Sequence, residues 1–364
     1  MNLLNKLWKT RRDSIIAFAL VLIAYPVIQA MVTGGSLSRA MTGQLVPICV
    51  YIVMAVSLNL TVGILGELSL GHSGFMCVGA FVGVTTSILL HDTVTSEPMR
   101  LAIAMVVAAA AAALVGVLVG LPVLRLRGDY LAIVTLAFCE IIKVLFQNFY
   151  LGKDENGLHF DLIEKNFELG EGGVLIIDGP SGIPSGVMRP ERIATFGAGM
   201  ILVLFTLFVV LNLINSRHGR AIMAVRDNKI AADSIGISTT RYRLLAFVIS
   251  ASLAGMAGAL YGASQTVIEA KKYDFNLSIL VLVFVVLGGL GNIWGSIISA
   301  TLLTLLPELL RDLNAYRMLI YAILLIAMML FNNSKLKGML VERLRGLKDR
   351  RKTGNAAQTE GEVD

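Results

Sequence analysis

Two residues of opposite charge lie three positions apart inside a long apolar stretch of the chain. Glu140 and Lys143 fall within the run 129–150, and their spacing places both on one face of a helix. Charges at membrane depth are costly and usually face the interior of a helix bundle or a watery cavity. Glu140 is therefore a candidate for the lining or gate of a translocation pathway, and the alternative is a structural ion pair.

A second polar segment, 63–74, interrupts the apolar pattern with four glycines, two serines, an acid and a histidine. Glycine disfavours a helix interior by about 1 kcal/mol relative to alanine. Non-helical backbone at membrane depth survives only when it is buried in protein or lines a watery cavity. We expect a broken or re-entrant entry beside the pathway, contributed by Glu67, Ser69, His72 and Ser73. The alternative is a polar turn at the cytoplasmic surface, and His72 suits a hydrogen-bonded packing role better than a proton relay.

The segment 217–236 is a charged loop in which residues at helical spacing form a small, mildly apolar stripe. These residues are Ala221, Ala224, Val225, Asn228, Ala231, Ala232 and Ile235. The charged residues lie mostly away from this stripe, and Gly236 is well placed as the helix C-cap. The pattern predicts a short amphipathic helix over 219–235 that docks onto a partner protein, or alternatively lies on the lipid surface.

The elements that position these residues are membrane spans. The chain has 364 residues, of which 56% are hydrophobic, and its mean hydropathy of +0.75 excludes a soluble domain. A bilayer core needs about 20 apolar residues per helical span. Ten stretches near that length, the eighth to tenth somewhat shorter, lie at 14–32, 44–64, 71–90, 101–121, 129–150, 193–214, 243–264, 277–290, 294–310 and 316–331. We predict an all-α, polytopic helical bundle over 14–331.

The lysines and arginines predict the topology. Basic residues crowd the tail 1–13 and the tail 332–364, which places both ends in the cytoplasm and requires an even number of spans. Ten spans also place the basic loop 215–242 inside and the acidic connection 151–192 outside. The C-terminal tail is expected to be disordered. A cleaved signal peptide is the alternative for the first 32 residues, although no clear cleavage site follows the long apolar run.

Small residues recur four positions apart within the spans, at Gly79/Gly83, Gly116/Gly120 and Gly258/Gly262. Such faces let helix backbones approach closely in lipid, so we expect a tightly packed bundle. Cys49, Cys77 and Cys139 lie inside spans, are odd in number and match no metal spacing, which favours a packing role.

Sequence features of an energy-coupling or catalytic site are missing. The chain contains no G-x-x-x-x-G-K-[ST] loop, so it cannot cradle ATP phosphates by that device. The glycine cluster Gly288, Gly289 and Gly291 is not such a loop either, because it lacks the lysine that contacts the phosphates. No Ser/His/Asp set or metal-binding cluster presents itself, so we predict neither a catalytic residue nor a metal site.

Five sequence blocks resemble one family of transporters. Ala231, Ala232 and Gly236 are similar to the Glu-Ala-Ala-x-x-x-Gly loop by which permeases of ABC importers engage their ATPases, with Ile230 in place of the glutamate. The wider block 224–237 resembles the branched-chain amino-acid permeases more closely. Four further blocks agree with that family, and with the intervening spans they cover most of 44–331: 66–75, 124–136, 179–183 and 286–295.

The resemblance implies the larger, M-type permease subunit of a high-affinity importer for leucine, isoleucine and valine in the bacterial inner membrane. It implies a second permease, two ATPase subunits that bind ATP and Mg²⁺, and a periplasmic or surface substrate-binding protein, with no cofactor in this chain and no nucleic-acid partner. The residues implied in ATPase coupling are Arg220, Val225, Arg226, Asp227, Ala231, Ala232 and Gly236.

Other functions fit parts of the pattern. Permeases for urea, short amides or other amino acids share the overall arrangement. A stand-alone transporter driven by an ion gradient would use Glu140 as its coupling carboxylate, but the chain shows no convincing inverted repeat. An intramembrane enzyme would need a catalytic pair of polar residues at facing depths, and no nucleophile is evident.

Overall fold

The computed structural model describes residues 26–310, except 27, 31, 33, 35–37, 127, 155–156, 163–172 and 189–192, and a few residues between 316 and 326. The chain divides into two units, Met1–Leu305 and Leu306–Asp364. All elements below belong to the first unit, apart from the last residues of α12. The predicted first and last spans, 14–32 and 316–331, lie largely outside the described residues.

Helix α2, Arg39–Asn59, passes without a break into a π-helix, a rarer helical form. The helix begins at Ser38, whose side chain accepts a hydrogen bond from the Met41 amide. It continues as a π-helix, η1, over Leu60–Leu65, which ends at Gly66 with a positive φ of 80°. The non-helical linker 66–71 leads into α3, His72–Leu89.

The next helices are connected to a small sheet. Helix α4 spans Glu97–Val123 and α5 spans Asp129–Gln147. Strands β1 (Phe149–Asp154), β2 (Gly157–Leu162) and β3 (Val174–Asp178) form an antiparallel sheet in the order β2-β1-β3. The 3-10 turn η2 (Gly179–Ser181) and the short helix α6 (Ser185–Met188) follow. This sheet corrects the all-α prediction, although the described chain is mostly helical.

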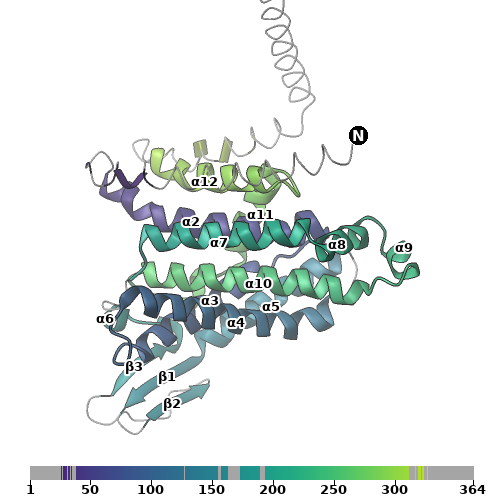
Figure 1. The fold of residues 1–364 in the computed structure, drawn as a ribbon. Coiled ribbons are helices and arrows are strands. Elements are labelled where there is room, and N and C mark those ends of the chain that lie inside the picture. The colour runs from purple at the N-terminus through teal and green to yellow at the C-terminus, as the bar shows by residue number, and fades with distance from the viewer. Residues whose placement is uncertain are drawn as a thin grey trace, which may run out of the picture. The chain divides into compact units, whose positions relative to one another are not determined.

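The second half begins with α7, Phe196–Asn215, followed by two short helices, α8 (Arg217–Asp227) and α9 (Lys229–Ser234). Helix α10, Thr239–Ser264, is the most central element and packs against α3, α4 and α2. The 3-10 turn η4 (Ala270–Lys272) precedes α11 (Phe275–Gly288) and α12 (Ile293–Leu309). Figure 1 shows α8 and α9 at the end of α7 and α10 that is opposite to the sheet.

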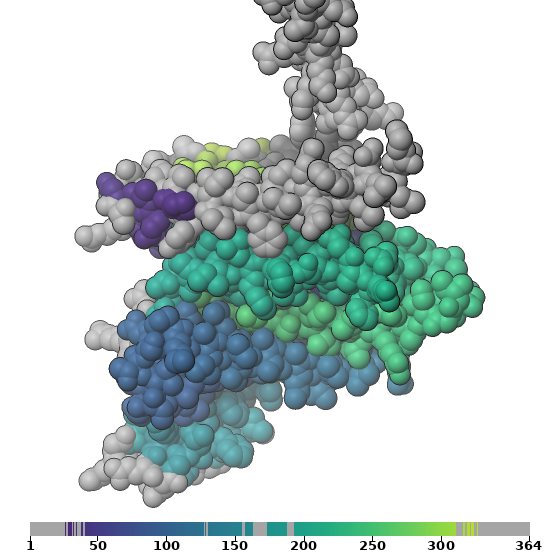
Figure 2. Space-filling model, viewed as in Figure 1, coloured from purple at the N-terminus to yellow at the C-terminus, as the bar shows by residue number. Residues whose placement is uncertain are grey.

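Glycines form the contacts at the centre of the bundle. Gly79 of α3 lies against the backbone of Gly255 in α10, and Gly258 lies against the Met76 carbonyl of α3. Gly116 of α4 packs against Ala251 of α10. Side chains of α10 form a green strip between α7 (teal) and α4 (blue) in Figure 2. The predicted close packing at the small residues is therefore confirmed.

Six of the described helices are long and apolar enough to cross a membrane. They lie at Met41–Leu65, His72–Leu89, Glu97–Val123, Tyr130–Gln147, Phe196–Asn215 and Thr239–Ser264. Each coincides with one of the predicted spans. The shorter helices α11 and α12 coincide with the predicted spans 277–290 and 294–310, and the total of ten remains a prediction.

Candidate functional site

Helix α3 begins deep inside the bundle. Its first residue, His72, is buried, and its Nε2 lies 2.8 Å from the hydroxyl of Ser57, which belongs to the middle part of the span 41–65. The linker therefore turns back beside the helix that it leaves before α3 starts. This geometry agrees with a broken entry, and the contact agrees with the predicted packing role of His72.

Three helices meet at the start of α3. The Ser73 amide donates to the Ser278 hydroxyl at 3.1 Å, and the Ser73 hydroxyl donates to the Asp274 carbonyl at 2.9 Å. The same hydroxyl lies 3.0 Å from the sulfur of Cys139 on α5. The buried hydroxyl of Ser69 has no hydrogen-bond partner among the described residues. The structure thus brings Ser73 together with the start of α11 and with Cys139 of α5, whereas His72 contacts Ser57 of α2.

Glu67, in the same linker, has a different set of partners. It forms an ion pair with Arg243, a buried residue at the start of α10, which also donates to the carbonyl of Leu124 at the end of α4. Burial raises the pKa of the Glu67 carboxyl, and the charges of Arg243 and Lys229 oppose that shift. The pair joins the linker 66–71 to the ends of two other helices.

The segment 217–236 contains two helices, not the single helix that we predicted over 219–235. The Ser216 hydroxyl caps α8, and the side chain of Asn228 ends the run and caps α9 by accepting from the Ala231 amide. Asn228 has extended backbone angles, which a continuous helix excludes. Short polar side chains that bond to nearby amides favour such caps over helix interiors.

The predicted apolar stripe is also partly wrong. Two of its members, Val225 and Ala232, are buried against the chain itself, whereas Asn228, Ala231 and Ile235 are exposed. Ile222, which was not part of the predicted stripe, is buried as well. The break at Asn228 rotates α9 relative to α8, so one helical period cannot describe both. The large exposed apolar side chains at this end of the segment are Ile230 and Ile235, and Ala232 is not accessible.

The end of α9 follows the prediction for Gly236. This residue has a φ of +83°, its amide bonds to the Asp233 carbonyl, and the Ile237 amide bonds to the Ala232 carbonyl, both at 3.0 Å. These two bonds define a Schellman motif, in which glycine takes the left-handed position without steric cost.

Arg226 links this segment to the membrane core. Its guanidinium pairs with Asp227 and donates to the carbonyl of Gly63 in η1 at 3.4 Å. In the preceding turn, the side chain of Asn59 accepts from the Gly291 amide and donates to the Ser296 hydroxyl, both at 2.9 Å. The α8 segment, the π-helix and the α11–α12 turn are therefore in contact. Arg220 donates to the Asn215 carbonyl at the end of α7.

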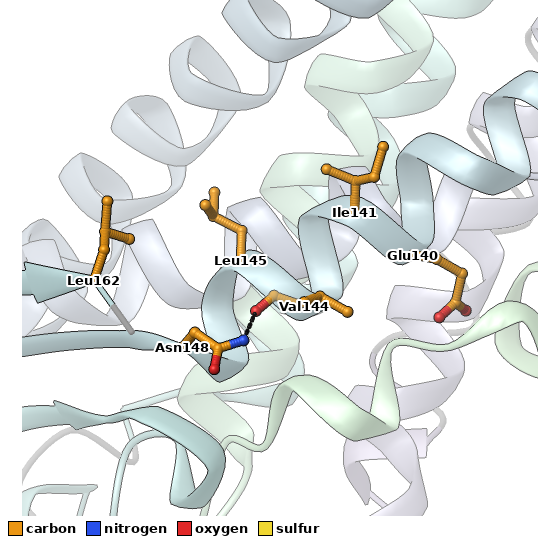
Figure 3. A pocket seen from close by; sticks show the side chains of 6 residues that line it. All are labelled: Glu140, Ile141, Val144, Leu145, Asn148 and Leu162. Carbon is orange, nitrogen blue, oxygen red and sulfur yellow. Dashed lines mark hydrogen bonds between the residues drawn. The ribbon is translucent and has the colours of Figure 1, made fainter. Parts of the chain in front are cut away.

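Glu140 and Lys143 form the ion pair that their spacing predicts. Glu140 lies at the edge of a groove of about 530 Å³ along α5, which Ile141, Val144, Leu145 and Asn148 also line together with Leu162 of β2. Figure 3 shows Glu140 at one end of this groove and Leu162 at the other. Cys139 points to Ser73 of α3, so the adjacent Glu140 lies on a different side of α5 from this contact.

Sequence reasoning missed Arg243, Asn59 and Ser278. Each is a polar residue within or at the end of an apolar run, a signal that predicts a buried hydrogen bond but not its partner. Within the described residues, no three His, Cys, Asp or Glu side chains are grouped to hold a metal ion.

Repeated apolar helices with buried polar contacts define this chain as a multi-pass membrane protein of the helical class. It belongs to the family described as branched-chain amino acid transport system / permease component, which matches residues 40–329.

Two relatives are high-affinity branched-chain amino acid transport system permease proteins LivM, from Salmonella typhimurium and Escherichia coli. Each is 36% identical to the chain over 342 residues, which cover 91% of the chain and 76% of the relative. BraD of Pseudomonas aeruginosa, named as a permease of the same kind, is 25% identical over 79% of the chain and 91% of its own length. No solved structure matches the chain significantly.

Proposed function

We propose that this chain is a membrane-spanning permease subunit of an ATP-driven importer that carries leucine, isoleucine and valine into the cytoplasm. The observation that carries this proposal is the match over 40–329 to a family of branched-chain amino acid permeases. The 36% identity to two permeases named for high-affinity branched-chain amino acid transport supports the same substrates.

The proposed topology has ten spans with both ends in the cytoplasm of a bacterial inner membrane. Basic tails at 1–13 and 332–364 and the basic loop 215–242 support it. The positions of α8–α9 and the sheet at opposite ends of the helices also agree with it (Figure 1). On this arrangement the sheet faces the outside and α8–α9 face the cytoplasm.

The importer would contain a second permease, two ATPase subunits and a substrate-binding protein outside. ATP and Mg²⁺ would bind to the ATPases, which carry out hydrolysis, and this chain would be the transport subunit. We assign ATPase docking to α8 and α9. The exposed Arg226, Asp227, Ile230 and Ile235 would make the contact, and the buried Val225 and Ala232 would hold the two short helices in place.

The contacts of Arg226 supply a route from the docking segment to the membrane core. A displacement of α8 would act on the Gly63 carbonyl in η1, and Asn59 connects that helix to the turn at Gly291. π-Helical turns are rare and are frequently found at functional sites. Glu67, Ser69, His72, Ser73 and Glu140 remain our candidates for the pathway.

Substrate competition tests the proposed function. Cells that lack their own branched-chain uptake systems would express this chain with its companion permease, ATPases and binding protein. We expect uptake of labelled leucine that excess isoleucine or valine suppresses and excess urea or acetamide does not. Uptake of urea with no uptake of leucine would contradict the proposal.

A further inference from the structure

Helix α5 has one packed face and one exposed face. Its buried side chains recur at helical spacing: Leu131, Ala132, Thr135, Cys139 and Ile142. The large exposed ones follow the opposite face: Tyr130, Ile133, Ile141, Val144 and Leu145. Among the described residues, this second face has no protein neighbour along most of the helix.

Lipid is a poor cover for this face because of the ion pair at its edge. The Glu140 side chain is 36% exposed and that of Lys143 is 18% exposed, in the middle part of a membrane helix. Ionised side chains at that depth are expensive in contact with hydrocarbon. The exposed faces of α4 and α7 differ, because 101–123 and 196–215 contain no charged residue. Those two faces suit lipid, and the face of α5 does not.

The exposed face continues onto the sheet. Leu162 of β2 lines the same groove as Val144 and Leu145 (Figure 3). Along β2, Leu158, Phe160 and Leu162 alternate with less exposed residues and are 52%, 71% and 50% exposed. Alternate residues of a strand share one face, so three large apolar side chains lie together on it.

Strand β2 cannot lie in hydrocarbon. In the order β2-β1-β3 it is an edge strand, so one side of its backbone has no strand partner among the described residues. Open sheet edges are excluded from the lipid core because their amides and carbonyls would lack hydrogen bonds. The apolar face of β2 is therefore outside the bilayer core, where lipid tails do not reach it.

We propose that the exposed face of α5 and the apolar face of β2 form one docking surface for the companion permease subunit. A partner that spans the membrane can cover both the mid-helix ion pair and the strand outside the bilayer core. A soluble binding protein reaches β2 but not Glu140, and lipid reaches α5 but not Phe160. The inference rests on the proposed function, which supplies the second permease. This docking surface requires a polar group of the companion permease near Glu140 and Lys143.

Site-specific photo-crosslinking in the complete importer tests this surface. Benzoylphenylalanine would replace Phe160 on β2 or Ile141 on α5, and Val106 on α4 or Phe208 on α7 as matched exposed controls. We expect crosslinks to the companion permease at Phe160 and Ile141, with yields at least tenfold above those at the controls. Crosslinks from Phe160 to the binding protein, to a differently tagged second copy or within the chain would overturn the inference, as would capture of lipid alone at Ile141.

A charge substitution supplies an independent readout. Phe160→Asp should lower recovery of the companion permease with the tagged chain at least tenfold. Met99→Asp, a matched change at an exposed apolar residue near the start of α4, should leave recovery unchanged. Equal recovery with Phe160→Asp and the unsubstituted chain would contradict the docking surface. Failure of the unsubstituted chain to recover any companion permease would contradict the proposed function itself.

Discussion

Glu67 and Arg243 form an ion pair at the point where three parts of the chain meet, although 176 residues separate them. Glu67 belongs to the linker between η1 and α3, and Arg243 to the first turns of α10. The Arg243 guanidinium also donates to the carbonyls of Leu124 and Leu126 after α4. One side chain therefore holds the ends of three helical segments together.

Removal of one partner of this pair should destabilise the fold strongly. A buried carboxylate left without its partner typically costs about 3–5 kcal/mol. We expect Arg243→Met to lower the free energy of unfolding in detergent by an amount in this range. Glu67→Gln combined with Arg243→Met should cost less than the sum of the two single changes. Additive effects would contradict a direct interaction between the two side chains.

The close contact between α3 and α10 should tolerate no side chain at Gly258. A Cβ at this position would collide with the Met76 carbonyl and the Ala80 amide of α3. Gly258→Val should therefore destabilise the protein by about 1–3 kcal/mol, as overpacked interiors do. Gly43→Val is the matched control, because a Cβ at Gly43 meets no described atom within 4 Å. Similar unfolding curves for the two variants would show that the helices separate easily.

The helices were the predictable part of this fold, and the reason is physical. Each crossing of the hydrocarbon core requires about 20 mostly apolar residues, so every span appears in the sequence as a long apolar run. Gly236 was predictable too, because its left-handed backbone is a local property. The sheet was not predictable. Strands β2 and β3 are short and lie in a polar connection, and the pairing of these strands depends on residues that are distant in the sequence. The break at Asn228 and the partners of Arg243 also depend on tertiary contacts that no local pattern contains.

The conformation of Gly236 yields a prediction for ATPase docking. A non-glycine residue in the left-handed region costs about 1–2 kcal/mol, and asparagine tolerates this region better than valine. Gly236→Val should weaken association with the ATPase by about tenfold, equivalent to about 1.4 kcal/mol. Gly236→Asn should bind nearly as well as the original chain. A Cβ at Gly236 meets no described atom within 4 Å, so equal weakening by both variants would contradict the backbone explanation.

The exposed isoleucines of α9 and of its C-cap provide a second test of docking. Ile230 and Ile235 are 81% and 75% exposed, so their replacement by aspartate should not disturb the core. We expect each change to weaken ATPase association while the unfolding transition of the isolated chain is retained. Ala232→Glu is a poor probe, because Ala232 is 3% exposed and the change would disturb the packing of α9 itself. Normal association of both isoleucine variants would place the docking surface elsewhere.

Chemical labelling checks the proposed orientation of the sheet and of α9. Cys49, Cys77 and Cys139 are buried and would first be replaced by alanine. Leu158→Cys on β2 should react with a membrane-impermeant maleimide from outside intact cells. Ile230→Cys on α9 should react with the same maleimide only after the membrane is opened, so that the reagent reaches its cytoplasmic face. Reaction of both positions from the same side would contradict the ten-span topology.

Uptake by the purified importer in proteoliposomes tests the central claim most directly. The vesicles would contain this chain, the companion permease and the ATPases, with the substrate-binding protein and labelled leucine outside and ATP with Mg²⁺ inside. We predict concentrative leucine uptake that stops when the ATPase active sites are inactivated and is unaffected when ion gradients are collapsed. Leucine accumulation that persists with inactive ATPases and follows an imposed ion gradient would contradict this account.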